Sequence, residues 1–101
     1  MNERPMTAGR LRELLAAFKA RYGAEYGLLA LGYFGSYARN IATAGSDVDV
    51  IFDTSSPNLF MTAMMKQDLE TLLGRPVDVL QLRGLTNLRL KARIEAEAVY
   101  V

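Results

Sequence analysis

The sequence contains no cysteine and no histidine. Without cysteine there is no disulfide and no thiolate zinc site, which fits a reducing, cytoplasmic setting. Without histidine, the commonest metal ligand and the commonest general base are missing as well. Any catalysis must therefore depend on carboxylates, hydroxyls, arginines, lysines and bound ions.

The chain also lacks an excess of charge of either sign and any long apolar run. Its 12 basic and 11 acidic residues give a formal net charge of +1, far from the broad positive field of a dedicated nucleic-acid binder. No apolar run reaches the length of a membrane span, and the first residues lack the apolar core of a signal peptide. Half of the 101 residues are hydrophobic, enough for a compact core, so we expect residues 1–101 to form one domain. Since neither a membrane span nor a signal peptide is found, we expect this domain to be soluble and cytoplasmic.

Apolar periodicity and turn residues predict an α/β (α+β) domain, with a mixed sheet of about three or more strands flanked by about four helices. The expected elements are, in order, a helix from about Thr7 to Tyr22, a strand over Leu28–Phe34, a short helical turn around Tyr37–Ile41, a strand over Asp47–Phe52, a helix from Pro57 to about Leu73, a strand over Val77–Leu80 and a last helix capped by Thr86. Ser56 is the expected N-cap of the helix that begins at Pro57. The pattern does not specify the order of the strands in the sheet.

Two of these helices have a side that we expect to be buried. In the helix that ends near Leu73 it consists of Met61, Met64, Met65, Leu69 and Leu72. In the last helix it consists of Leu88, Ala92, Ala96 and Val99. The last helix is also basic early and acidic late, where Glu95 and Glu97 oppose the helix dipole. This charge order either lowers the stability of the helix slightly or indicates that the basic groups have a partner.

Asp47 and Asp49 stand at alternate positions of the apolar strand Asp47–Phe52. Side chains at i and i+2 of a strand project the same way, so the two carboxylates lie together. Two like charges on an apolar element are unfavourable unless a cation lies between them. In a chain without histidine or cysteine, the candidate is an oxygen-binding ion such as Mg²⁺, which takes further ligands from water and phosphate.

Asp78 adds a third carboxylate in the middle of the strand Val77–Leu80. If this strand neighbours the second strand, the three aspartates meet on one face and can hold two Mg²⁺ ions, as in two-metal nucleotidyl transfer. Asp78 is then a candidate general base. The alternative is purely structural: Asp47 caps the start of a strand, Asp49 pairs with an arginine, and Asp78 lies on a solvated edge.

The dipeptide Gly35-Ser36 precedes this strand by ten residues. It is either an ordinary turn or a phosphate-binding turn, in which glycine allows close approach and N–H groups with the Ser36 hydroxyl bind the β- and γ-phosphates at a helix N-terminus. Arg39 is a surface residue or a clamp on the triphosphate, and we favour the clamp. Tyr37 is expected to pack or to line the rim.

Two further groups have ordinary interpretations. Asp53 follows the alternation of its strand but is near the strand end, where a role in a turn is expected. Four basic side chains occur close together in the last third of the sequence, and they form either a solvated face or a contact with an acidic partner: Arg83, Arg89, Lys91 and Arg93.

Gly35-Ser36, ten intervening residues and Asp47-Val48-Asp49 together resemble the signature of the DNA polymerase β-type nucleotidyltransferase superfamily. The chain length, the segment 75–79 (Arg-Pro-Val-Asp-Val) and the segment 93–100 are similar to its minimal members, the MNT proteins. The resemblance implies Asp47, Asp49 and Asp78 as metal ligands, and Gly35 and Ser36 as nucleotide contacts. Many relatives have glycine where this chain has Asn40, but asparagine tolerates left-handed backbone angles, so we expect the turn to be kept.

The resemblance also implies a biological role. MNT proteins are typically antitoxins paired with HEPN-domain ribonuclease toxins, usually from an adjacent gene, and the pair forms a hetero-oligomer. The characterised ones transfer AMP from ATP to a tyrosine of the toxin, in a type VII-like system. We therefore expect a Mg²⁺-dependent protein adenylyltransferase that uses ATP.

Three other functions remain open from the sequence. A non-catalytic antitoxin would neutralise the toxin by binding alone. A nucleotidyltransferase acting on a small molecule or RNA would need acceptor-binding regions for which this short chain has little room, and its near-neutral charge argues against stable nucleic-acid binding. A structural domain would leave three strand aspartates unexplained.

Overall fold

The computed structural model describes residues 6–101, so residues 1–5 of the expected domain lie outside the described residues. The elements within this range are α1 (Ala8–Tyr22), β1 (Leu28–Phe34), β2 (Val48–Thr54), α2 (Leu59–Leu73), β3 (Val77–Gln81), the 3₁₀ helix η1 (Leu82–Gly84), α3 (Leu88–Glu97) and β4 (Val99–Tyr100). None of the helices in this part of the chain is long and apolar enough to span a membrane.

The four strands form one mixed sheet in the order β3-β2-β1-β4. β1 is antiparallel to both β2 and β4, whereas β2 and β3 are parallel. Parallel neighbours need a long crossover connection, and α2 supplies it between β2 and β3. This arrangement confirms the α/β class and the mixed sheet expected from the sequence.

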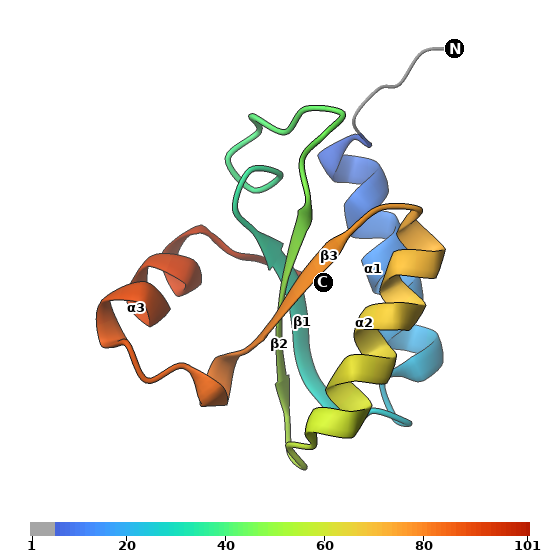
Figure 1. Ribbon diagram of the computed structural model, residues 1–101, viewed down its shortest axis with the longest axis vertical. Helices are drawn as coiled ribbons and strands as arrows, with labels where there is room; N and C mark the ends of the chain where they lie inside the picture. Colours follow the sequence, from blue (N-terminus) through green and yellow to red (C-terminus); the bar gives the residue numbers. More distant parts are fainter. Residues whose placement is uncertain (1–5) are drawn as a thin grey trace.

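The sheet separates two layers of helices (Figure 1). α1 and α2 pack together against one face, and α3 stands on the other face. The main core fills the space between the sheet and the α1–α2 layer, and β2 contributes Val48, Val50 and Phe52 to it. Since strand side chains alternate, Asp49 points to the opposite face, toward α3. The candidate carboxylates therefore lie outside the main core.

The start of α2 differs from the prediction. β2 continues to Thr54, because the buried Thr54 hydroxyl donates a hydrogen bond to the Tyr26 carbonyl (3.1 Å), so the chain leaves the sheet later than expected. The N-cap is Asn58, whose side chain accepts hydrogen bonds from the N–H groups of Phe60 (2.9 Å) and Met61 (3.2 Å). The assignment of Ser56 as cap, with Pro57 as first helical residue, was therefore wrong.

The buried side of α2 also differs in part. Met65, Leu69 and Leu73 are its buried residues, whereas Met64 and Leu72, both expected inside, are 46% and 43% exposed. The side that contacts the sheet is thus centred on the row Met65–Leu69–Leu73, at the i, i+4, i+8 positions of one helix face. The predicted end of the helix is confirmed, since Gly74 caps it in the left-handed conformation (φ 67°).

The C-terminal segment differs most from the sequence-based prediction. Asn87, rather than Thr86, caps α3, and its side chain accepts from the Leu90 N–H at 3.1 Å. Ile94 is the buried residue of this helix, while Leu88 is 77% exposed. Val99, expected on the helix, lies instead in β4, which pairs with β1. Gly32 makes this pairing possible, because a Cβ at that position would collide with the Val99 carbonyl oxygen.

Candidate functional site

Asp49 and Asp78 are register partners on the parallel strands β2 and β3. Equivalent positions of neighbouring strands project to the same face, so the two carboxylates lie side by side. Burial raises the pKa of Asp49 most, and the negative charges of Asp78 and then Asp47 raise it further, while Arg39 opposes them. Asp47 thus belongs to the same electrostatic cluster, but it comes just before β2 and not within the strand, where the sequence predicted it.

The donor set of this cluster fits Mg²⁺. Among residues 6–101, no three acidic side chains converge closely enough to form a complete metal site by themselves. Mg²⁺, however, usually takes only one or two carboxylates and completes its shell with water and substrate phosphate. Arg39 offsets only part of the repulsion at Asp49, and a bound cation would relieve the rest. The residues present therefore match the chemistry of that ion.

The Gly35-Ser36 turn lies directly beside this cluster. Phe34, the last residue of β1, pairs with Asp49 across the antiparallel strands, and Gly35 follows it. Gly35 is buried and has φ 72°, and a Cβ there would overlap the Asp49 carboxylate. Both the backbone angle and the contact require glycine at this position. The glycine of the expected phosphate-binding turn is therefore in contact with a candidate metal ligand.

The residues after Gly35 form hydrogen-bonded turns, where the sequence predicted a short helical turn. The N–H of Arg39 donates to the Gly35 carbonyl and that of Ile41 to the Ser36 carbonyl, each at 3.0 Å. Asn40 has φ 60°, and this left-handed residue prevents a regular helix from continuing. Asparagine thus keeps the turn, as expected, but no regular helix begins at Ser36.

Glu97, the last residue of α3, contacts the same turn. One of its carboxylate oxygens accepts the Gly35 N–H at 2.7 Å, and the other lies 3.5 Å from Nη1 of Arg39. Sequence reasoning did not assign Glu97 to the site. The available signal was its position at the helix C-terminus, where the dipole disfavours negative charge and a glutamate indicates a partner elsewhere.

Tyr37 and Arg75 connect the turn to the start of β3. Tyr37 is 3% exposed, so it packs rather than lining a rim. Its hydroxyl accepts a hydrogen bond from Nη1 of Arg75 at 2.7 Å, and the buried Nε of Arg75 has no partner among the described residues. Arg75 thus ties the Gly35-Ser36 turn to the strand that carries Asp78.

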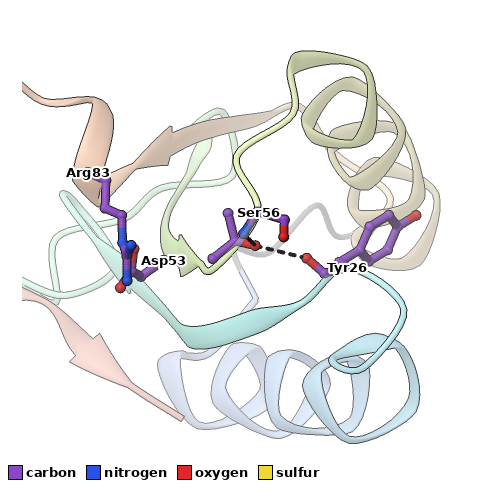
Figure 2. A network of polar contacts seen from close by, with 5 residues as sticks. Tyr26, Asp53, Ser56 and Arg83 are labelled. Atoms are coloured by element: carbon purple, nitrogen blue, oxygen red, sulfur yellow. Dashed lines mark hydrogen bonds and ion pairs between the residues drawn. The ribbon is translucent and has the colours of Figure 1, made fainter.

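Asp53 has a different environment, although it projects to the same face of β2 as Asp49. The sequence placed it in a turn, but it lies within the strand, where Nε of Arg83 contacts its Oδ1 at 2.7 Å. Figure 2 shows Arg83 reaching Asp53 from the segment that follows β3. Asp53 is therefore paired, while Asp49 is surrounded by like charges. One member of the expected basic face, Arg83, forms an ion pair with this aspartate.

An open groove of about 490 Å³ lies beside the aspartate pair. Asp49, Asp78 and Lys66 contribute its charged groups. Its other lining residues are Phe34, Leu59, Thr62, Ala63, Val79 and Leu80. β3 is an edge strand of the sheet, so the groove is reached from solvent at this edge. A polar ligand has room next to the carboxylates.

Residues 11–101 match the family model described as the nucleotidyltransferase domain. The chain is 33% identical over 97 residues to the protein adenylyltransferase MntA of Thermococcus cleftensis, covering 95% of this chain and 97% of the relative. Its fold is similar to a solved structure described as a candidate minimal nucleotidyltransferase, with a TM-score of 0.79, 34% identity and coverage of 93% of this chain and 95% of the other. A crystal structure of a toxin–antitoxin with AMP-PNP shares the fold at 18% identity, with a TM-score of 0.70 and coverage of 94% of this chain and 72% of that one.

The match extends over nearly the whole of both chains, and it includes the segments that carry the aspartate pair, the glycine turn and Asp78. Relatives at 33% and 34% identity over such a length share more than a general architecture. The chain therefore belongs to the nucleotidyltransferase domain family and is one of its minimal nucleotidyltransferases.

Proposed function

We propose that this nucleotidyltransferase is the antitoxin of a toxin–antitoxin pair and transfers AMP from ATP to a tyrosine of a HEPN-domain toxin. The observation that carries the proposal is the Asp49–Asp78 pair, in register on parallel strands, with Asp49 directly beside Gly35. Carboxylates beside a glycine turn suit a metal-bound triphosphate.

Each site residue has a role in this proposal. Asp47, Asp49 and Asp78 hold Mg²⁺, with two ions as the full complement. When bound, the ions supply Lewis-acid stabilisation of the negative charge that develops on the phosphates. The Gly35 N–H and the Ser36 hydroxyl hold the β- and γ-phosphates, and Arg39 pairs with their charge.

The reaction exchanges one phosphorus–oxygen bond for another. The tyrosine hydroxyl oxygen of the toxin attacks the α-phosphorus of ATP, and the bond from that phosphorus to the bridging oxygen of the β-phosphate breaks. Pyrophosphate leaves, and the tyrosine hydroxyl proton passes to the Asp78 carboxylate as general base. The Asp78 side chain is exposed at the groove, so an acceptor brought by a second protein has access to it.

Two features support a protein acceptor. The relative from Thermococcus cleftensis is named a protein adenylyltransferase, and the structure with AMP-PNP is described as a toxin–antitoxin. The groove at the carboxylates is open along the edge of the sheet, which suits an acceptor presented on a protein surface. We expect the toxin gene to be adjacent, the two proteins to form a hetero-oligomer, and the reaction to take place in the cytoplasm.

The test is intact-mass spectrometry of the neighbouring HEPN protein after incubation with ATP, Mg²⁺ and this chain. We expect mass increases of whole AMP units, with peptide mapping placing the modification on tyrosine. The double variant Asp47→Asn, Asp49→Asn should abolish the increase. The matched control Asp53→Asn, a change on the same face of β2 but at a paired aspartate, should retain it.

Three other outcomes would contradict parts of the proposal. A stable complex of the two proteins without any mass increase would contradict catalysis and support an antitoxin that acts by binding. A mass increase that survives the double aspartate change would remove the aspartate pair from the mechanism. Transfer to a small molecule or to RNA, with none to the HEPN protein, would assign a different acceptor.

A further inference from the structure

The carboxylate of Glu97 occupies the place where the proposed function puts a phosphate. The Gly35 N–H donates to one of its oxygens at 2.7 Å, and Arg39 Nη1 lies 3.5 Å from the other. A main-chain N–H combined with a guanidinium is an arrangement that binds anions in general, carboxylate and phosphate alike. The two groups assigned to the triphosphate are therefore engaged by a side chain of the same molecule.

The surroundings of Glu97 are otherwise unfavourable to a negative charge. Its carboxylate lies near enough to Asp49 to add to the repulsion there. It also sits at the C-terminus of α3, the negative end of the helix dipole. The contacts with Gly35 and Arg39 are its favourable ones in the described structure. An anion that binds these donors more strongly will displace it.

We propose that Glu97 occupies the triphosphate subsite of the free chain and must leave it before ATP binds, so that this residue determines nucleotide affinity. The inference rests on the proposed function, since it assigns the Gly35–Arg39 subsite to the phosphates. The Glu97 side chain is 20% exposed and so has a path to solvent. Because Glu97 is the last residue of α3, its release also removes the contact between that helix and the nucleotide site.

The test is the affinity of AMP-PNP with Mg²⁺ for the full chain and its variants, measured by calorimetry. Glu97→Gln keeps the size of the side chain but removes its charge, and Glu97→Ala vacates the subsite. We expect both to bind AMP-PNP more tightly, on the order of tenfold, because no charge-assisted contact has to be broken first. The matched control is Glu95→Gln, the same change two residues earlier on the same helix, and its affinity should equal that of the wild type.

Three outcomes would overturn the inference. Equal affinity of the wild type and the Glu97 variants means that the carboxylate does not compete with the nucleotide. Weaker AMP-PNP binding, together with weaker binding of Mn²⁺ alone, means that Glu97 is a metal ligand. Absence of AMP-PNP binding to the wild type and to every variant would contradict both the assignment of the subsite and the proposed function.

Failure of the proposed function alone has its own signature. The Glu97 variants would then bind AMP-PNP more tightly than the wild type, yet neither they nor the wild type would transfer AMP to the HEPN protein. Nucleotide affinity therefore tests the role of Glu97, whereas the mass increase of the toxin tests catalysis.

Discussion

Asp49 of β2 and Asp78 of β3 are partners in a parallel register, so two carboxylates leave the sheet side by side on its α3 face. Their neighbours within the two strands are valines, and the repulsion, after burial, helps to raise the pKa of Asp49 above its ordinary value. Like charges in register destabilise a sheet, so without a cation this pair lowers the stability of the fold. Sites of this kind retain function at the expense of stability.

Replacing Asp49 by asparagine should stabilise the metal-free chain. The change removes a charge that burial and its neighbours disfavour, and we expect a small gain in the free energy of unfolding, because solvent screens part of the repulsion at this partly exposed site. Asp53→Asn on the same face should destabilise the chain instead, because it leaves Arg83 without its partner. Urea unfolding measures the stability of both variants.

Adding Mg²⁺ should stabilise the wild type and not Asp49→Asn, and a wild type whose stability does not change with Mg²⁺ would contradict the metal assignment.

Gly35→Ala should destabilise the chain more than Gly74→Ala. Both glycines have positive φ, 72° and 67°, so each alanine carries a backbone strain of about 1 kcal/mol. At Gly35 the new Cβ also collides with the Asp49 carboxylate, whereas at Gly74 nothing lies within 4 Å. We expect a loss of about 2 kcal/mol or more for Gly35→Ala. Thermal unfolding of the two variants compares them, and equal losses would mean that the Asp49 side chain moves aside without cost.

Asn58→Ala should destabilise the chain by about 1 kcal/mol, because the N–H groups of Phe60 and Met61 lose their acceptor at the start of α2. Ser56→Ala, at the position that local pattern favours as the cap, should change stability by less than about 0.5 kcal/mol. Chemical denaturation of both variants measures the difference. A larger effect at Ser56 than at Asn58 would show that the helix begins earlier in solution.

Stability should fall as the pH rises above the ordinary tyrosine pKa of 10.0, and Tyr26 should account for part of the fall. Burial, followed by the hydrogen bond to Asp68 (2.5 Å), raises the pKa of Tyr26 in the folded chain. The unfolded chain therefore releases this proton at a pH where the folded chain still holds it. The contribution is complete below the unfolded pKa and is lost as the pH rises toward the folded one.

Tyr26→Phe tests this dependence. The variant should be less stable at neutral pH by about 1 kcal/mol, since the hydrogen bond to Asp68 is gone, but its stability should decline less steeply in alkali. Urea unfolding at several pH values on both sides of 10.0 gives the two slopes. Parallel slopes would show that other groups govern the alkaline transition.

Local sequence signals identified many of the elements correctly. The helix from about Thr7 to Tyr22 and the strand Leu28–Phe34 were predicted with their observed bounds to within a residue, since long apolar periodicity and flanking glycines define them. Errors occurred where neighbouring polar residues compete as caps. Asn58 and Asn87 have the same capping chemistry as Ser56 and Thr86, and contacts elsewhere in the fold decide between them.

The candidate site likewise contains features that the local sequence predicts and one contact that it does not. The glycine turn and the spacing of Asp47 and Asp49 are local features that the sequence shows directly. Asp49 lies within β2 but Asp47 comes just before it, so strand alternation by itself does not place both carboxylates. Glu97 was missed because it comes from the far end of the chain, 62 residues from Gly35. A contact at such separation leaves no periodic signal in the sequence.

The sequence by itself thus determined the types of most elements and the chemistry of the aspartates and glycines, because backbone preferences and side-chain periodicity act over a few residues. The tertiary structure decided that β3 lies beside β2 in parallel, which brings Asp78 level with Asp49. It also decided that β4 joins β1 at Gly32 and that Glu97 reaches the turn. These pairings depend on which surfaces bury the most apolar area when the whole chain folds, and no local stretch contains that information.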